Sequence, residues 1–259
     1  MNKVSYSVDE WGIAVMKINN PPMNALDEQV MFELEDCAKR IPSDEKVKVV
    51  IITGEGPTFV VGADINKVKE VDTLEKGIEA TSKAHAILNL IENSKKPYIA
   101  AINGLCLGGG MELALACHMR MAGEQAQMGL PEIMLGIMPG FGGTQRSARL
   151  LGTAKALEIM LTGKFIDMKE AEKIGLVNMV VVPNEEVLAK AVSLAKKIVT
   201  KGQVAVRAIV EAVIEGVKLP FDDGLKLESR LFGRLAESED KREGIDAFLE
   251  KRKPAFKDR

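Results

Sequence analysis

Two glycine-rich segments, each carrying one glutamate, place the strongest constraint on the fold of this chain. Residues 103–112 (NGLCLGGGME) end in Glu112 and directly follow a short apolar stretch, and residues 129–144 (GLPEIMLGIMPGFGGT) contain Glu132. Glycine clusters permit positive φ angles and let the main chain approach a ligand where a Cβ atom would clash. Each segment therefore predicts a tight passage from a strand into a helix, with a carboxylate beside it.

The hydrophobic pattern before residue 183 alternates between strands and helices. Residues 47–53 (VKVVIIT) form a β-branched run that is typical of a strand buried on both faces. The other predicted strands are residues 11–18, 97–102 and 177–182, and the predicted helices are residues 25–41, 73–91 and 112–117. Strands interleaved with helices predict an α/β fold with largely parallel strand pairing.

The pattern changes near residue 184, beyond which only helices are predicted. They span residues 185–200, 203–217, 222–236 and 239–251. A run of helices after an α/β region indicates an appendage or an assembly element. We therefore divide the chain into a core domain of residues 1–195, which carries the site, and a helical oligomerisation region of residues 196–259.

The composition argues against several classes of partner. Thirty-five basic and 37 acidic residues leave a net charge of −2, which disfavours nucleic-acid binding. No run of about 20 apolar residues is present, so no membrane span is expected, and the first residues lack the apolar core of a signal peptide. Three cysteines without metal-ligand spacing predict reduced thiols, no metal site and a cytoplasmic location.

The glycines of the first segment predict a site for a developing negative charge. A helix that starts at Gly109 directs its free N–H groups and its positive dipole end at a ligand. Residues 59–65 (FVVGADI) form a second glycine turn that would supply another main-chain donor to the same oxyanion. The alternative is that these glycines serve only tight turns and close helix packing, and their spacing alone does not decide between the two.

The two glutamates predict proton delivery and proton removal within one pocket. Glu112 alone would also suit a helix start because of the helix dipole. Glu132 has apolar neighbours, which are a poor environment for a carboxylate without a role. Paired carboxylates also serve glycosidases, but one Trp and two Tyr leave few aromatic platforms for a sugar.

Four blocks of sequence together resemble the enoyl-CoA hydratase/isomerase (crotonase) superfamily, and within it the short-chain enoyl-CoA hydratases. They are residues 59–65, residues 99–116 (IAAINGLCLGGGMELALA), residues 129–145 and residues 239–259 (EDKREGIDAFLEKRKPAFKDR). The spacing between the blocks matches as well, and the resemblance covers nearly the whole chain. It implies a spiral of ββα units with a C-terminal helical region that forms trimers, or hexamers that are dimers of trimers.

The resemblance also assigns the roles of an acyl-CoA site. The backbone N–H groups of Ala63 and Gly109 would form the oxyanion hole for the thioester carbonyl. Glu112 would hold and deprotonate the attacking water, and Glu132 would protonate Cα. The N–H of Gly140 would help to position the water and the acid.

Three further positions correspond to contacts with coenzyme A. Val61 lies in the segment near the adenine, where the family usually has a smaller residue. Phe232 and Lys251 correspond to C-terminal residues that reach the coenzyme A of a neighbouring subunit. No metal or redox cofactor is implied, because coenzyme A is part of the substrate.

The presence of both glutamates favours hydration of a 2-enoyl-CoA to a 3-hydroxyacyl-CoA, a reaction of fatty acid β-oxidation. Enoyl-CoA isomerisation, dienoyl-CoA hydration and acyl-CoA hydrolysis are alternatives within the superfamily. An RNA-binding or scaffolding member is a third hypothesis, which the net charge disfavours. Residues 66–79 shape the acyl tunnel in the family, but their sequence does not give a chain length.

Overall fold

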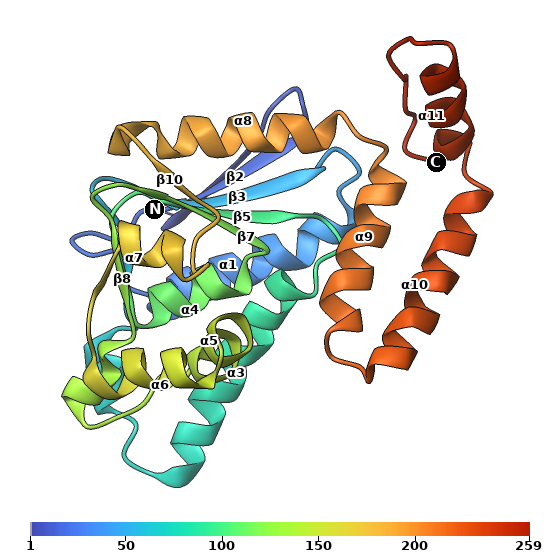
Figure 1. Cartoon of the computed structure of the whole chain (residues 1–259). Helices are drawn as coiled ribbons and strands as arrows, with labels where there is room; N and C mark the ends of the chain where they lie inside the picture. The colour runs from blue at the N-terminus through green and yellow to red at the C-terminus, as the bar shows by residue number, and fades with distance from the viewer. Residues whose placement is uncertain (1) are drawn as a thin grey trace.

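A six-stranded sheet and a four-stranded sheet form the centre of the computed structural model, which describes residues 2–259 (Figure 1). The large sheet has the order β1 (Val4–Val8), β2 (Ile13–Ile18), β3 (Val49–Gly54), β5 (Tyr98–Ile102), β7 (Met119–Gly123) and β10 (Met179–Val181). The small sheet has the order β4 (Thr58–Val61), β6 (Leu105–Leu107), β8 (Gln127–Gly129) and β9 (Ile166–Asp167). Only β1 with β2 and β8 with β9 pair antiparallel among these strands, which confirms the predicted parallel pairing.

The chain alternates between the two sheets as it winds. The strands β3, β5 and β7 lie in the large sheet, and each is followed by a strand of the small sheet, β4, β6 and β8. The helices that follow are α2 (Ile65–Lys69) and α3 (Leu74–Glu92), then α4 (Gly109–Ala116), then the 3-10 helix η2 (Pro131–Leu135), α5 (Gly143–Leu151) and α6 (Thr153–Thr162). These repeated turns form the predicted spiral of ββα units.

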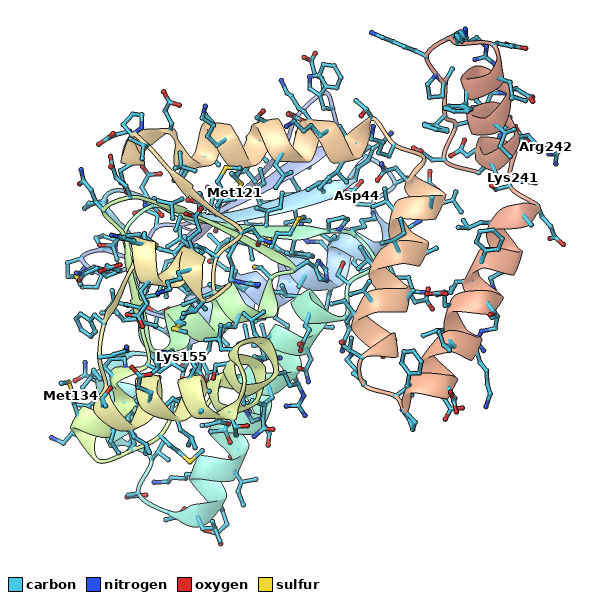
Figure 2. The ribbon with its side chains drawn as sticks, viewed as in Figure 1. Asp44, Met121, Met134, Lys155, Lys241 and Arg242 are labelled. Carbon is cyan, nitrogen blue, oxygen red and sulfur yellow. The ribbon has the colours of Figure 1, made fainter. Side chains whose placement is uncertain are left out.

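The large sheet is buried on both faces, as the β-branched run of β3 predicts. Val50 and Ile52 of β3 belong to the core shared with α1 (Glu28–Arg40), α3 and α4. Val49 and Ile51 point to the opposite face, where they join a second core with residues of α8 (Val187–Val199). Figure 1 shows α8 on one side of the sheet and α1 and α4 on the other, and Figure 2 shows Met121 between α8 and the sheet.

Short elements complete the core. The 3-10 helix η1 (Ile41–Ser43) extends α1, and α7 (Met168–Lys173) and the 3-10 helix η3 (Asn184–Glu186) flank β10. The side chain of Asp27 caps α1 by accepting a hydrogen bond from the N–H of Val30. No helix within residues 2–259 combines the length and the apolar character that a membrane crossing requires.

The C-terminal helices α9 (Gln203–Gly216), α10 (Phe221–Ala236) and α11 (Glu239–Leu249) project away from the sheets (Figure 1). The last residues return to the core, since Asp258 accepts a hydrogen bond from the N–H of Gln203 and forms an ion pair with Lys48. The helix α8 packs on the sheet through Val199, so the predicted division after residue 195 falls inside its last turns. The separation of an oligomerisation region stays a prediction.

The predicted strands and helices are present with small shifts of their ends. The strand predicted over residues 11–18 begins at Ile13, and the helix predicted over residues 25–41 spans Glu28–Arg40. The elements that were not predicted from the sequence are β1, β4, β6, β7, β9, α2, α6 and α7. The strand β6 has three residues and lies inside a glycine-rich segment, where no hydrophobic period can develop.

Candidate active site

Three chain turns meet at one edge of the small sheet. The N–H of Gly62, after β4, donates to the carbonyl of Leu107 at 2.8 Å, and the N–H of Gly108, after β6, donates to the carbonyl of Gly129 at 2.9 Å. These bonds tie together the carboxyl ends of neighbouring parallel strands, where α/β folds place their ligands. The edge therefore gathers the two glycine turns and the segment that carries Glu132.

The amides predicted to bind an oxyanion lie side by side at this edge. An ideal Cβ built on Gly109 would lie 3.5 Å from the amide nitrogen of Ala63. Gly109 is the first residue of α4, so its N–H has no partner inside the helix. Within residues 2–259, neither of the two N–H groups donates a hydrogen bond to a protein acceptor. Two free donors at the positive end of a helix dipole suit a carbonyl oxygen that gains negative charge.

Glu132 approaches the same turn from η2. Gly108 has a φ of +55°, and a Cβ atom there would lie 3.1 Å from Oε1 of Glu132. Glycine at this position is therefore required both by the backbone conformation and by the approach of the carboxyl group. Oε2 of Glu132 is buried without a hydrogen-bond partner, and burial raises the pKa of Glu132 above its usual value. A buried carboxyl oxygen without a partner is expected to face a ligand or to carry a proton.

Glu112 lies in the first turn of α4 and is 1% exposed. Its Oε1 accepts hydrogen bonds from the N–H of Phe141 at 2.7 Å and from the N–H of Gly143 at 2.6 Å. Burial raises the pKa of Glu112 to about 7, and the nearby charge of Glu132 adds to this, while the two amides and the charge of Arg146 act in the opposite direction. A carboxyl group that titrates near neutral pH suits general acid–base catalysis.

The donors to Glu112 come from the loop that joins η2 to α5. The amides that contact Glu112 belong to Phe141 and Gly143. Gly140 was predicted to position the water and Glu132. The role of Gly140 toward a water molecule stays a prediction. Glycine spacing signals such a loop, but it does not tell which N–H groups point inward.

The predicted contacts to coenzyme A are distributed over the chain. Val61 ends β4 beside the glycine turn, and its N–H donates to the carbonyl of Met23. Phe232 on α10 is 74% exposed, and Lys251 follows α11 with a φ of +57°. Figure 1 shows α10 and α11 on the side of the molecule away from α4, the helix that carries Glu112.

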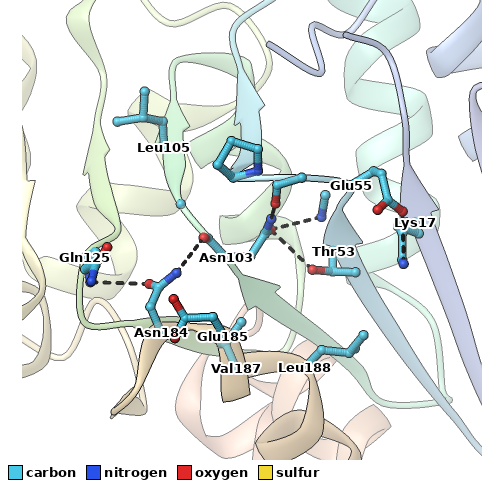
Figure 3. Close-up of a pocket in the computed structure, with 14 residues that line it drawn as sticks. Lys17, Thr53, Glu55, Asn103, Leu105, Gln125, Asn184, Glu185, Val187 and Leu188 are labelled. Atoms are coloured by element: carbon cyan, nitrogen blue, oxygen red, sulfur yellow. Dashed lines mark hydrogen bonds and ion pairs between the residues drawn. The ribbon is translucent and has the colours of Figure 1, made fainter. Parts of the chain in front are cut away.

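A cavity of about 600 Å³ lies elsewhere, at the ends of β3 and β5 and the start of α8 (Figure 3). Two asparagines of its lining are paired: Asn103 accepts from the N–H of Gly54 and donates to the carbonyl of Gly56, and Asn184 donates to the carbonyl of Asn103. Neither Glu112 nor Glu132 belongs to its lining. The bonds connect the ends of β3 and β5 to the start of α8.

Comparisons with known proteins agree over the full length. The family model described as enoyl-CoA hydratase/isomerase matches residues 9–259. The chain is 45% identical to a probable enoyl-CoA hydratase of Bacillus subtilis, with 99% of both chains covered. It is 43% identical to the crotonyl-CoA hydratase of Syntrophomonas wolfei, with 94% of both covered. The crystal structure of an enoyl-CoA hydratase from Bacillus anthracis superposes with a TM-score of 0.94 at 37% identity, covering 99% of this chain and 100% of that one.

Proposed function

This chain belongs to the enoyl-CoA hydratase/isomerase family, and from that membership we propose that it is an enoyl-CoA hydratase. The reaction adds water across the α,β double bond of a 2-enoyl-CoA and yields a 3-hydroxyacyl-CoA. The observation that carries the proposal is the position of Glu112 and Glu132 at the same edge of the small sheet as two unpartnered amides. Isomerisation or hydrolysis of an acyl-CoA ester needs the two amides for the carbonyl oxygen but does not require both glutamates.

The amides of Ala63 and Gly109 would hold the thioester carbonyl. As water attacks Cβ, electron density moves from the double bond to the carbonyl oxygen, which becomes an enolate. Donors fixed in advance stabilise this charge, and loss of one such donor typically costs about 3–4 kcal/mol in the transition state.

The two glutamates would divide the proton transfers. Glu112, when ionised, takes one proton from the attacking water, and the resulting hydroxyl oxygen bonds to Cβ. Glu132, when protonated, gives its proton to Cα as the enolate collapses to the thioester. A raised pKa for Glu132 favours its protonated form, which the donor of this proton requires.

The relative from Syntrophomonas wolfei is named for crotonyl-CoA, so we propose that this chain accepts short 2-enoyl-CoA esters. We also propose a homotrimer, or a hexamer built as a dimer of trimers, in a cytoplasmic location. In that assembly Phe232 and Lys251 of one subunit contact the coenzyme A bound at the site of its neighbour, and Gly140 helps to position the water.

The test replaces Glu132 by Gln and follows the consumption of crotonyl-CoA together with identification of the product. We expect kcat to fall by roughly 100-fold or more while the ester still binds, because general acid catalysis contributes about 100- to 10,000-fold. Glu124→Gln is the matched control, because Glu124 is exposed and lies outside the site. Hydration at the parental rate by the Glu132→Gln variant, or an isomer or free acid as the parental product, would contradict the proposal.

A further inference from the structure

Arg146 is a charged side chain close to the site that the proposed acid–base chemistry does not use. It lies on α5, and its side chain is 9% exposed. Its Nε and Nη2 donate to Oε2 of Glu92 at 3.1 and 2.8 Å, and Nη2 also donates to Oδ1 of Asn89 at 2.7 Å. A nearly buried arginine with a carboxylate and an amide as partners is held in one orientation.

The fourth bond of this guanidinium leads to the active site. Nη1 of Arg146 donates to the carbonyl oxygen of Phe141 at 2.9 Å. The N–H of the same residue donates to Oε1 of Glu112 at 2.7 Å. Arg146 and Glu112 therefore hold Phe141 from opposite sides, one through its carbonyl group and the other through its amide.

The local backbone is adapted to this arrangement. Gly142 precedes α5 with a φ of +102°, and a Cβ atom on it would collide with Nη1 of Arg146. The guanidinium thus occupies the space that a side chain at residue 142 would take. Glu92, at the last turn of α3, supplies the anchor from a different helix, so the loop is fixed between α3 and α5.

We propose that Arg146, anchored by Glu92 and Asn89, is a positioning residue that fixes the Phe141–Gly143 loop and thereby the carboxylate of Glu112. The expected changes in kcat and KM rest on the proposed hydratase reaction, whereas the positioning of Glu112 by Arg146 does not. Arg146 does not touch the reacting atoms, and it acts on Glu112 through the main-chain amides from which Glu112 accepts and through its own positive charge. A planar guanidinium can bridge a carboxylate and a carbonyl at once, which the single ammonium group of a lysine cannot do in the same geometry.

The charged groups that act on the carboxyl group of Glu112 are Glu132, whose Oε2 is buried, and Arg146, whose side chain is 9% exposed. The positive charge of Arg146 lowers the pKa of Glu112, and so do the amides that it holds in place. Loss of Arg146 should therefore raise the pKa of Glu112 through both routes. Because Glu112 must be ionised to accept a proton from water, the acidic limb of the kcat profile should move to higher pH.

The experiment compares Arg146→Gln, Arg146→Lys and the control Arg149→Gln. Arg149 lies on the same helix, and within residues 2–259 its side chain donates hydrogen bonds only to Gln145. We expect Arg146→Gln to lower kcat by roughly 10- to 100-fold, since a displacement of about 1 Å in a catalytic group can cost about 100-fold. We expect KM to change by less than about threefold, because the bound ester is not contacted. Arg146→Lys keeps the charge and should show a smaller pH shift together with a loss of kcat.

A second measurement does not depend on activity. Titration of ¹³C-labelled glutamate carboxyl groups by NMR, with Glu112 assigned by its absence in Glu112→Gln, should show a higher pKa for Glu112 in Arg146→Gln than in the parent. If the parent fails to hydrate crotonyl-CoA, the proposed function fails and this titration still decides the role of Arg146. An unchanged titration of Glu112 in both Arg146 variants, or an effect of Arg149→Gln of equal size, would overturn the inference.

Discussion

Glu112, the proposed base, carries an electrostatic cost in the folded state. Its carboxyl group is 1% exposed, and burial is the main reason for a pKa of about 7. The hydrogen bonds that Oε1 accepts from two main-chain amides offset only part of the cost of burying the charge. The folded protein therefore binds a proton at Glu112 over a pH range in which the unfolded chain has already released it.

This difference predicts that Glu112→Gln stabilises the protein at alkaline pH. The folded-state pKa of about 7 lies above the reference value of 4.5, so the contribution of Glu112 to the free energy of unfolding is lost as the pH rises between these values. The full loss is on the order of 3 kcal/mol, since one pKa unit corresponds to about 1.4 kcal/mol. A glutamine keeps an oxygen that can accept both N–H bonds and carries no charge.

The measurement is the Tm of Glu112→Gln relative to the parent between about pH 5 and about pH 8, where linkage predicts a growing gain. Glu124→Gln serves as the control for the loss of an exposed carboxylate. A difference in Tm that stays constant over this pH range would show that burial does not raise the pKa of Glu112 in the folded protein.

At the scale of elements, Asn103 joins β3, β5 and the turn before β4. Its Oδ1 accepts from Oγ1 of Thr53 at 3.3 Å and from the N–H of Gly54 at 3.1 Å, and its Nδ2 donates to the carbonyl of Gly56 at 2.7 Å (Figure 3). The main-chain carbonyl of Asn103 accepts from Asn184, which precedes α8. The Asn103 side chain thus holds the end of β3 and the turn through which the chain passes from the large sheet to the small sheet.

We predict that Asn103→Ala destabilises the fold without a direct effect on the chemistry. Removal of the side chain leaves partly buried main-chain groups without partners, and each such group costs about 1–3 kcal/mol. Urea unfolding should give a free energy of unfolding lower by roughly 2 kcal/mol, with an unchanged m-value. Asn66→Ala is the control, because Asn66 is exposed on α2. If Asn103→Ala and Asn66→Ala lowered the free energy of unfolding equally, the hydrogen bonds of Asn103 would make no net contribution to stability.

The elements also show which parts of the fold the sequence could predict. The run of residues 47–53 predicts β3 because a strand buried on both faces needs apolar residues at every position. Strands of three residues such as β6 leave no such signature, since glycines and a helix start surround them. At the site, the glycine turns and both glutamates were predictable, whereas the contact of Arg146 with Glu92 depends on how α3 and α5 pack and has no local signal.

At the scale of the whole molecule, the C-terminal helices expose several apolar side chains. Ile209 and Val213 on α9 and Val217, which follows its last residue, lie at four-residue spacing, and all three are exposed. Phe221 and Phe248, on α10 and α11, are exposed as well. Exposed apolar groups in helical register indicate a protein–protein contact, which agrees with the proposed oligomer.

A carboxylate placed in this stripe should weaken the assembly. We predict that Val213→Asp shifts the sedimentation equilibrium toward smaller species and raises the dissociation constant by roughly 30-fold or more, because a buried interface position typically contributes about 2 kcal/mol. KM for the CoA ester should rise with dissociation, since Phe232 and Lys251 are proposed to act at a neighbouring site. Lys241→Asp introduces the same group at an exposed position of α11, labelled in Figure 2, and is the control. The proposal that a neighbouring subunit contributes to the site would be contradicted by a parent that sediments as a monomer, or by a Val213→Asp variant with parental mass and parental KM. The two glutamates and the main-chain amides would then act within a single chain.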